Sequence, residues 1–263
     1  MTLESLGWSD FFRQGFKSKA LEAGLVPARI SRNSKHVYHI FCAEGKFVAR
    51  VSGSFRHRAN EPSEYPAVGD WVAVKISPDG LEAEIRELLP RETVFSRQGV
   101  SASGTESKSF QQVVACNVNV ALIVSALDGS RGFNKRRLER YLTLTRQSGA
   151  DPVIILNKID LCEDVEEKIN EARSVAADAP IYAINALENN GLEPLRQYMS
   201  EGSTIVMLGP SGIGKSTIIN QMAGETLMKT GEVREVDLRG RHTTTWSELL
   251  VLSSGGVVID TPG

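Results

Sequence analysis

The distribution of apolar residues divides the chain into two differently patterned halves. In the second half, short and mainly apolar runs predict buried strands at 118–124, 152–156, 180–184, 203–208 and 256–259. Between these runs, apolar residues at helical spacing predict helices over 134–147, 164–177 and 192–199, and a further helix start at 217. Strands that alternate with helices form a mainly parallel sheet with helices on both faces.

The first half has shorter apolar runs separated by glycine turns at 43–45 and 78–80. This spacing predicts a small barrel, and an oligonucleotide-binding (OB-like) barrel fits the length. Residues 1–35 read as a basic extension that orders on a partner, with a helix over 9–23 carrying Phe11, Phe12 and Phe16 near one face. The predicted barrel strands are 37–41, 46–51, 71–76 and 81–88.

Residues 96–112 are rich in Ser, Gly and Gln and predict a linker or mobile loop at the domain boundary. The expected order of regions is therefore an extension, a barrel, a linker and a nucleotide-binding domain. Their predicted bounds are 1–35, 36–95, 96–112 and 113–263.

The run 209–217 fits the phosphate-binding pattern G-x-x-x-x-G-K-[ST]. A predicted strand precedes it and a predicted helix follows it, which is the context that this pattern needs. Glycines let backbone N–H groups turn toward an anion, and a helix N-terminus adds partial positive charge. We expect Lys215 to reach the β- and γ-phosphates of a nucleotide and the Ser216 hydroxyl to bind Mg²⁺. The residues expected to bind phosphate are Gly209, Pro210, Ser211, Gly212, Ile213, Gly214, Lys215, Ser216 and Thr217.

A second motif, Asn157-Lys158-Ile159-Asp160, follows a predicted strand and indicates guanine as the base. An ionised Asp only accepts hydrogen bonds, and guanine offers two donors, N1–H and the N2 amino group, on one edge. We expect Asp160 to bind that edge, Asn157 to bond the opposite side of the base, and Lys158 to cover its face. A site built on such bonds rejects an analogue that lacks them by factors on the order of 10⁴.

The segment 260–263 fits a third pattern, D-x-x-G, after a predicted strand. We expect the Asp260 carboxylate to approach Mg²⁺ through a water molecule and the Gly263 N–H to face the γ-phosphate. Three threonines at 243–245 lie between this motif and the phosphate loop, and Thr244 or Thr245 is expected to complete the Mg²⁺ shell. A run of threonines is also typical of an edge strand.

The order of these motifs differs from that of an ordinary GTPase, in which N-K-x-D comes last. Here N-K-x-D precedes the phosphate loop, so the chain resembles the circularly permuted GTPases. Within that class, the barrel-like basic N-terminal region, 68–72 (Val-Gly-Asp-Trp-Val) and 240–245 (Gly-Arg-His-Thr-Thr-Thr) resemble the ribosome small-subunit-dependent GTPase A family (RsgA, or YjeQ). The expected fold class is α/β, a circularly permuted P-loop GTPase domain preceded by a small all-β, OB-like barrel.

The motifs predict hydrolysis of GTP to GDP and phosphate with Mg²⁺, and residues 1–10 lack an apolar signal-peptide core, which indicates the cytoplasm. The resemblance implies a factor that acts in late maturation of the small ribosomal subunit and whose hydrolysis is stimulated by that subunit. It implies that the Ala186 N–H contacts guanine O6, although Asn185 departs from the usual Ser before it. Many GTPases orient water with a Gln after D-x-x-G; no residue follows Gly263, so His242 is the candidate for this role. The family carries a zinc domain beyond this point, and we expect the sequence to be a truncated protein or fragment.

Charge adds a candidate RNA-binding region. The net charge is −2, yet residues 1–60 hold ten Lys or Arg and four Asp or Glu. A basic region ahead of an acidic nucleotide domain is typical of an electrostatic contact with nucleic acid, here rRNA, and also of a solvated surface with no partner. Aromatic residues of the barrel either stack on bases or form its core. The candidates are Tyr38, Phe47 and Phe55 for stacking and Lys46, Arg50, Arg56 and Arg58 for phosphates.

Other features limit the alternatives. No run of 18 apolar residues predicts a membrane span, and the three cysteines are too far apart for a C-x-x-C zinc motif. We expect a monomer that acts away from membranes. Two other functions stay open: a nucleotide-dependent RNA-binding module with negligible hydrolysis, and a P-loop ATPase or kinase with a coincidental N-K-I-D.

Overall fold

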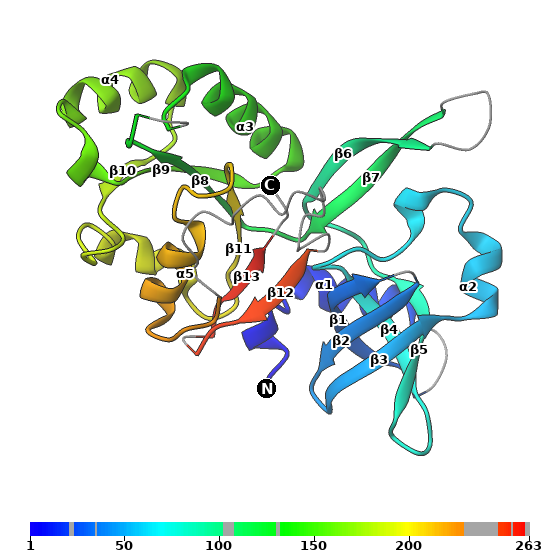
Figure 1. Ribbon diagram of the computed structural model, residues 1–263. Helices are drawn as coiled ribbons and strands as arrows, with labels where there is room; N and C mark the ends of the chain where they lie inside the picture. Colours follow the sequence, from blue (N-terminus) through cyan, green and yellow to red (C-terminus); the bar gives the residue numbers. More distant parts are fainter. Residues whose placement is uncertain are drawn as a thin grey trace, which may run out of the picture.

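A computed structural model of the chain is shown in Figure 1. It describes residues 1–20, 24–34, 36–101, 108–129, 132–228, 247–253 and 255–260. A barrel made by the first part of the chain lies beside an α/β layer made by the second part, and a two-stranded hairpin extends from the region where they meet.

The barrel is closed and has the strand order β1-β2-β3-β5-β4, with β4 paired back onto β1. Only the β3–β5 pair is parallel. Inward side chains form its core, and Tyr38 and Phe55 are 1% and 6% exposed, so these two aromatic residues belong to the core rather than to a base-stacking face. The strands are β1 (Val26–Ser34), β2 (Val37–Cys42), β3 (Gly45–Val51), β4 (Trp71–Ile76) and β5 (Glu82–Leu88).

The N-terminal segment is packed on this barrel rather than extended. A short turn, η1 (Glu4–Leu6), and helix α1 (Asp10–Lys19) place Trp8 and Phe12 against Trp71, with Trp8 and Trp71 ring centroids 4.7 Å apart. Strand β1 also lies within the predicted extension, so the first barrel strand begins at Val26 rather than after residue 35.

A hairpin occupies most of the stretch expected as a linker. Strands β6 (Val94–Ser101) and β7 (Lys108–Cys116) pair antiparallel from Val94↔Cys116 to Ser101↔Lys108. Polar side chains support the ladder, as in the hydrogen bond from Gln111 Nε2 to Ser96 Oγ. Residues 96–112 are mainly polar and therefore read as a loop, although Phe95 and Ala115 next to them are buried in the core.

The second part of the chain forms a parallel sheet in the order β10-β9-β8-β11-β13, with β12 antiparallel at β13. Strand β12 also pairs with β1 at Arg32↔Glu248, so the two sheets are continuous. The strands are β8 (Val120–Ala126), β9 (Asp151–Asn157), β10 (Ile181–Ile184), β11 (Thr204–Leu208), β12 (Glu248–Val251) and β13 (Val257–Asp260).

Helices cover both faces of this sheet because its strands are apolar on both sides. Ile123 of β8 packs in the cluster of α3 (Lys135–Ser148) and α4 (Val165–Ala176), whereas Leu122 packs with α5 (Lys215–Ala223) and η4 (Glu193–Met199). These elements lie within two residues of the predicted ones, and 193–199 is a 3₁₀ helix. No helix in the described ranges is both long and apolar enough to span a bilayer. The remaining short elements are α2 (Gly53–Arg58), η2 (Pro62–Glu64) and η3 (Ile159–Leu161).

Candidate nucleotide-binding site

The phosphate-binding loop lies between the end of β11 and the start of α5. Gly209, Gly212 and Gly214 have φ values of 143°, 83° and 97°, a region that side-chain-bearing residues rarely adopt. A Cβ atom on Gly209 would lie 2.6 Å from the Val124 carbonyl oxygen, and one on Gly214 would lie 2.4 Å from Asn157 Nδ2. The tight turn therefore requires glycine at these positions, and the lack of side chains also lets an anion approach the backbone closely.

Lys215 is folded back over this loop. Its Nζ donates hydrogen bonds to the carbonyl oxygens of Gly209, at 2.7 Å, and Pro210, at 2.8 Å. Burial lowers the pKa of Lys215, and the nearby Asp260 carboxylate opposes that shift. A cation is thus held at the N-terminus of α5, whose first turn has no acidic residue, and this combination attracts phosphate.

Asn157 links the phosphate loop to the loop after β10. Its Nδ2 donates to the Ile213 carbonyl oxygen at 2.9 Å, and its Oδ1 accepts from the Ala186 N–H at 3.1 Å. The side chain is buried, with the residue only 2% exposed. The sequence predicts direct base contacts for both Asn157 and Ala186; the structure has them bonded to each other, so Asn157 acts as a brace between the two loops.

Lys158 and Asp160 lie on the exposed side of the same motif. Lys158 has a left-handed backbone (φ 65°), and its Nζ lies 2.6 Å from Asp128 Oδ2 and 3.2 Å from the Gly212 carbonyl oxygen. Its aliphatic stem therefore crosses from the end of β9 to the phosphate loop. The Asp160 residue is exposed in η3, where its carboxylate is accessible to a base.

Asp128 is a site residue that the sequence interpretation missed. It follows the buried strand β8, which is next to β9 in the sheet, and it holds the Lys158 ammonium. The signal was present, because polar residues after neighbouring parallel strands gather at one edge of the sheet, where ligands bind in such folds.

Asp260 and Ser216, which the sequence predicts as Mg²⁺ ligands, lie on β13 and at the start of α5. Strand β13 pairs with β11 at Val206↔Ile259, so Asp260 ends the strand next to the one that leads into the phosphate loop. A carboxylate and a hydroxyl are hard oxygen donors, which suit Mg²⁺. Among the described residues there is no group of three or more His, Cys, Asp or Glu that would hold a metal alone, so no zinc site is seen there. His242, Thr244, Thr245 and Gly263 lie outside the described residues.

A buried arginine joins the barrel to the strand that carries the loop. Arg29 is 1% exposed and donates from Nε to the Gly69 carbonyl oxygen, from NH2 to the Asn117 carbonyl oxygen at 3.0 Å and from NH1 to Thr204 Oγ1 at 2.9 Å. NH1 also donates to the Leu6 carbonyl oxygen. Burial lowers the pKa of Arg29 to about 10 despite the attraction of Asp70. Because Thr204 begins β11, this contact anchors the barrel to the phosphate-loop strand.

Known proteins share both the sequence and the fold. The family model described as RsgA GTPase matches residues 88–263. Two relatives named small ribosomal subunit biogenesis GTPase RsgA are similar over 100% of this chain: that of Opitutus terrae is 41% identical over 72% of its own length, and that of Syntrophotalea carbinolica is 39% identical over 71%.

Two solved structures resemble the chain in fold. The crystal structure of YjeQ from Thermotoga maritima has a TM-score of 0.64 at 21% identity and covers 91% of this chain and 75% of that one. The structure of YloQ, a circularly permuted GTPase, has a TM-score of 0.60 at 21% identity and covers 92% and 73%. The predicted fold class, a barrel followed by a permuted GTPase domain, is confirmed.

Proposed function

The chain belongs to the RsgA GTPase family, and on that premise we propose that it is a Mg²⁺-dependent GTPase that binds the small ribosomal subunit through its RNA during subunit maturation in the cytoplasm. Hydrolysis of GTP is the activity of the family as named. The ribosomal role comes from the names of the relatives, which are small ribosomal subunit biogenesis GTPases.

One observation carries the assignment of the site. Asn157 of the guanine motif is bonded to both the phosphate loop and the 185–187 loop, although these three segments are far apart in sequence. A single ligand that has a phosphate chain at one end and a guanine base at the other would span them. The exposed Asp160 carboxylate supplies the acceptor that distinguishes guanine from adenine.

The residues of this chain would contribute by position and charge. The loop amides at the start of α5 and the Lys215 ammonium would stabilise negative charge on the phosphates. Ser216 and Asp260 would hold Mg²⁺, which when bound neutralises charge on the β- and γ-phosphate oxygens. Lys158 would cover the base while Asp128 and the Gly212 carbonyl oxygen keep its ammonium in place.

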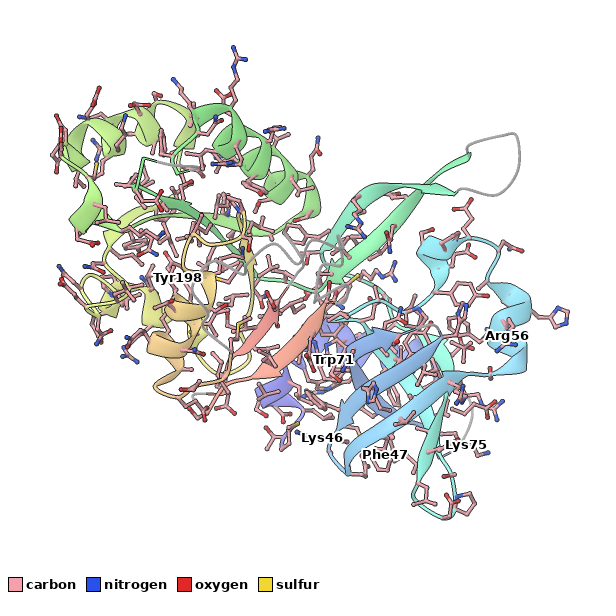
Figure 2. All side chains as sticks on the ribbon, viewed as in Figure 1. Lys46, Phe47, Arg56, Trp71, Lys75 and Tyr198 are labelled. Carbon is pink, nitrogen blue, oxygen red and sulfur yellow. The ribbon has the colours of Figure 1, made fainter. Side chains whose placement is uncertain are left out.

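The barrel offers an exposed cationic surface for RNA. Lys46 and Arg50 lie on the outward face of β3, opposite the inward Ala49, and both are exposed. Figure 2 labels Lys46 beside the partly buried Phe47 on this strand, and Arg56 on α2. Arg58 contributes less free charge, because it is paired with Glu87 at 2.8 Å. We assign phosphate contacts to Lys46, Arg50 and Arg56.

The test is a competition titration of the purified chain with GDP, GTP, ADP and ATP. We expect the guanine nucleotides to bind at least a hundredfold more tightly, since Asp160 pairs only with a guanine edge. Asp160→Ala should remove most of this preference while phosphate binding persists. Asp151→Ala is the matched control, because Asp151 is exposed at the opposite end of β9. Equal affinity of the unmutated chain for GTP and ATP would overturn the guanine assignment and favour an ATPase or kinase.

A further inference from the structure

Helix α3 has a net positive charge, whereas the part of the chain around it is acidic. It carries five Lys or Arg and one Glu, whereas the rest of 113–263 carries ten basic and eighteen acidic residues. An even distribution would give the helix an acidic balance like that of its surroundings. The charge of α3 is therefore a local property that the nucleotide site does not explain.

The arrangement of these cations is unfavourable for the helix itself. Lys135, Arg136 and Arg137 occupy its first turn, which has no acidic residue. Cations at a helix N-terminus oppose the helix dipole. Arg137 is used internally, since its NH2 donates to the Gly132 carbonyl oxygen. Within the described ranges, Arg136 and Arg140 are exposed and form no ion pair, so no internal contact accounts for them.

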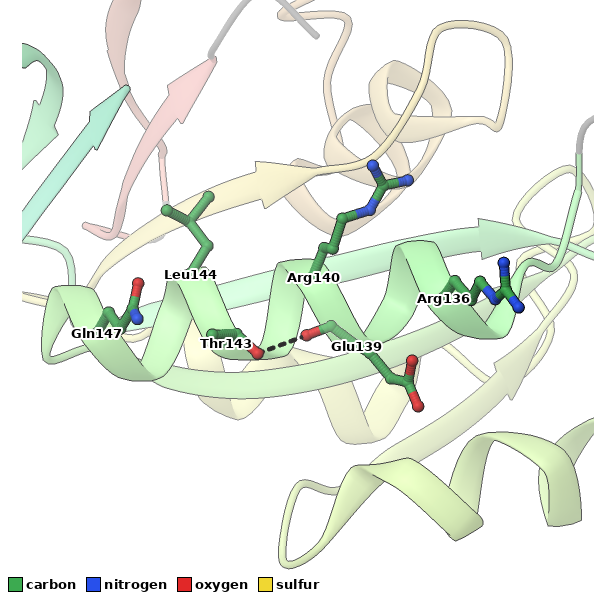
Figure 3. A pocket seen from close by; sticks show the side chains of 6 residues that line it. All are labelled: Arg136, Glu139, Arg140, Thr143, Leu144 and Gln147. Carbon is green, nitrogen blue, oxygen red and sulfur yellow. Dashed lines mark hydrogen bonds between the residues drawn. The ribbon is translucent and has the colours of Figure 1, made fainter. Parts of the chain in front are cut away.

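These two arginines lie along one shallow groove on the outer face of α3. Arg136 and Arg140 are one turn apart, a rise of about 6 Å. Figure 3 shows both guanidinium groups extending from the helix, with the Glu139 carboxylate directed away from Arg140. The groove continues over polar residues and contains a single, partly buried leucine. Its lining residues are Arg136, Glu139, Arg140, Thr143, Leu144 and Gln147.

The basic end of α3 is adjacent to the guanine motif. The segment before the helix starts at the end of β8, where Asp128 holds Lys158, and Gly132 packs against the Ala126 carbonyl oxygen. The other end of α3 reaches the start of the hairpin, since Gly149 lies against Thr93. The groove thus runs from the nucleotide edge of the sheet toward the region where the barrel and hairpin join it.

We propose that the outer face of α3, centred on Arg136 and Arg140, is a second RNA-docking surface that binds the phosphate backbone of small-subunit RNA. The proposal rests on the proposed ribosomal function and extends it to the GTPase half of the chain. Charge complementarity favours RNA, because unpaired arginines bind phosphate strongly. A protein partner would need aromatic or apolar anchors, and the groove offers only Leu144.

The experiment measures binding of the full chain to small-subunit rRNA as a function of salt. Arg136→Glu combined with Arg140→Glu should weaken binding at least tenfold at physiological salt. The slope of log K against log salt should fall by about 1.4 to 1.8, because each lost phosphate contact removes about 0.7 to 0.9. The control, Arg173→Glu with Arg196→Glu, makes the same charge change at exposed arginines of α4 and η4 that have local partners, and should leave both values unchanged.

Two further measurements fix the interpretation. GDP affinity should be unchanged in the Arg136/Arg140 double variant, which shows that the site is intact, and Arg136→Lys with Arg140→Lys should keep most of the RNA affinity because the charge remains. If the unmutated chain binds rRNA and the glutamate variant has the same RNA affinity and salt dependence as its control, the proposed RNA-docking role of α3 is wrong. The proposed ribosomal function would then still stand.

Other outcomes separate the two proposals. If the unmutated chain binds neither rRNA nor small subunits, both fail. If the glutamate variant keeps its affinity for naked rRNA and loses only affinity for assembled subunits, α3 contacts a ribosomal protein, and the RNA assignment is wrong.

Discussion

Asn157 is the residue through which the phosphate loop and the base motif depend on each other. Asn157→Ala would leave the Ile213 carbonyl and the Ala186 N–H without partners in a buried place. We expect the free energy of unfolding to fall by about 2 kcal/mol, within the usual cost of unpaired buried polar groups, and GDP affinity to fall with it. Urea unfolding and GDP titration measure the two effects.

The matched control for this change is Asn170→Ala. Asn170 is exposed on α4, and its loss should change stability by less than about 0.5 kcal/mol. Unaltered GDP affinity in Asn157→Ala would show that the brace is not needed for binding.

Lys215 makes the free energy of unfolding depend on pH, in a direction that its lowered pKa determines. Burial lowers its pKa below 10.5, the value in an unfolded chain. Between the folded and unfolded pKa values the unfolded state binds more protons than the folded state. The buried Lys215 loses its charge in this range, so the cost of burying that charge disappears and stability rises as the pH increases toward 10.5. The unfolding free energy of the unmutated chain minus that of Lys215→Met should therefore increase over this range. Denaturant unfolding from pH 7 to 10.5 measures it, and parallel pH curves for the two proteins would contradict the account.

At the scale of elements, the parallel strands of the nucleotide domain were predictable because they are continuous apolar runs. Strand β1 was not, because two of its buried residues, Arg29 and Ser31, are polar. Arg29 is buried against the Gly69 carbonyl oxygen, the Asn117 carbonyl oxygen and Thr204, which are distant in sequence, and Ser31 donates a hydrogen bond to the His39 carbonyl oxygen on the next strand. Local patterns cannot reveal such partners. The hairpin was missed because the pairing of β6 with β7 is not visible in the mainly polar sequence of 96–112.

The site residues also fall into those that a local sequence pattern predicts and those whose role depends on partners distant in sequence. The glycine spacing of the phosphate loop predicted its position between β11 and α5, because the turn itself requires glycine. The role of Asn157 as a brace was not predictable, since it depends on where the 185–187 loop comes to lie. The sequence suggested that the Lys158 stem covers the base, which remains a prediction, and its partner Asp128 was visible only once β8 and β9 were adjacent.

The junction between barrel and GTPase domain can be tested through Arg29. Arg29→Lys replaces a planar group that makes four hydrogen bonds with an ammonium that has three donors and a shorter reach. We expect a loss of roughly 2–3 kcal/mol in unfolding free energy, because a buried carbonyl loses its donor. Arg32→Lys, at an exposed position of the same strand, should have almost no effect. Equal stability of the two variants in urea would show that the junction is not held by this side chain.

At the scale of the whole molecule, the barrel and the GTPase domain share one continuous sheet and a buried polar junction. A ligand held on the barrel is therefore connected to the strand that leads into the phosphate loop. This geometry would link the RNA contacts that we propose for the barrel to the nucleotide site.

The barrel surface has its own prediction. Lys46→Glu combined with Arg50→Glu should weaken binding to small-subunit rRNA and reduce its salt dependence, since phosphate contacts release counterions. GTP affinity should stay the same, because both residues lie on β3, away from the phosphate loop. Filter binding at several salt concentrations measures the change, with Arg173→Glu and Arg196→Glu as the charge-matched control. Undiminished RNA affinity would remove these two residues from the interface.

The most direct test of the account as a whole is phosphate release from GTP and from ATP, with and without purified small ribosomal subunits. We predict that the chain releases phosphate from GTP and not from ATP, that small subunits increase the rate and large subunits do not, and that Lys215→Ala abolishes release in every condition. Phosphate release that does not distinguish GTP from ATP, or a rate from GTP that small subunits leave unchanged, would contradict the account.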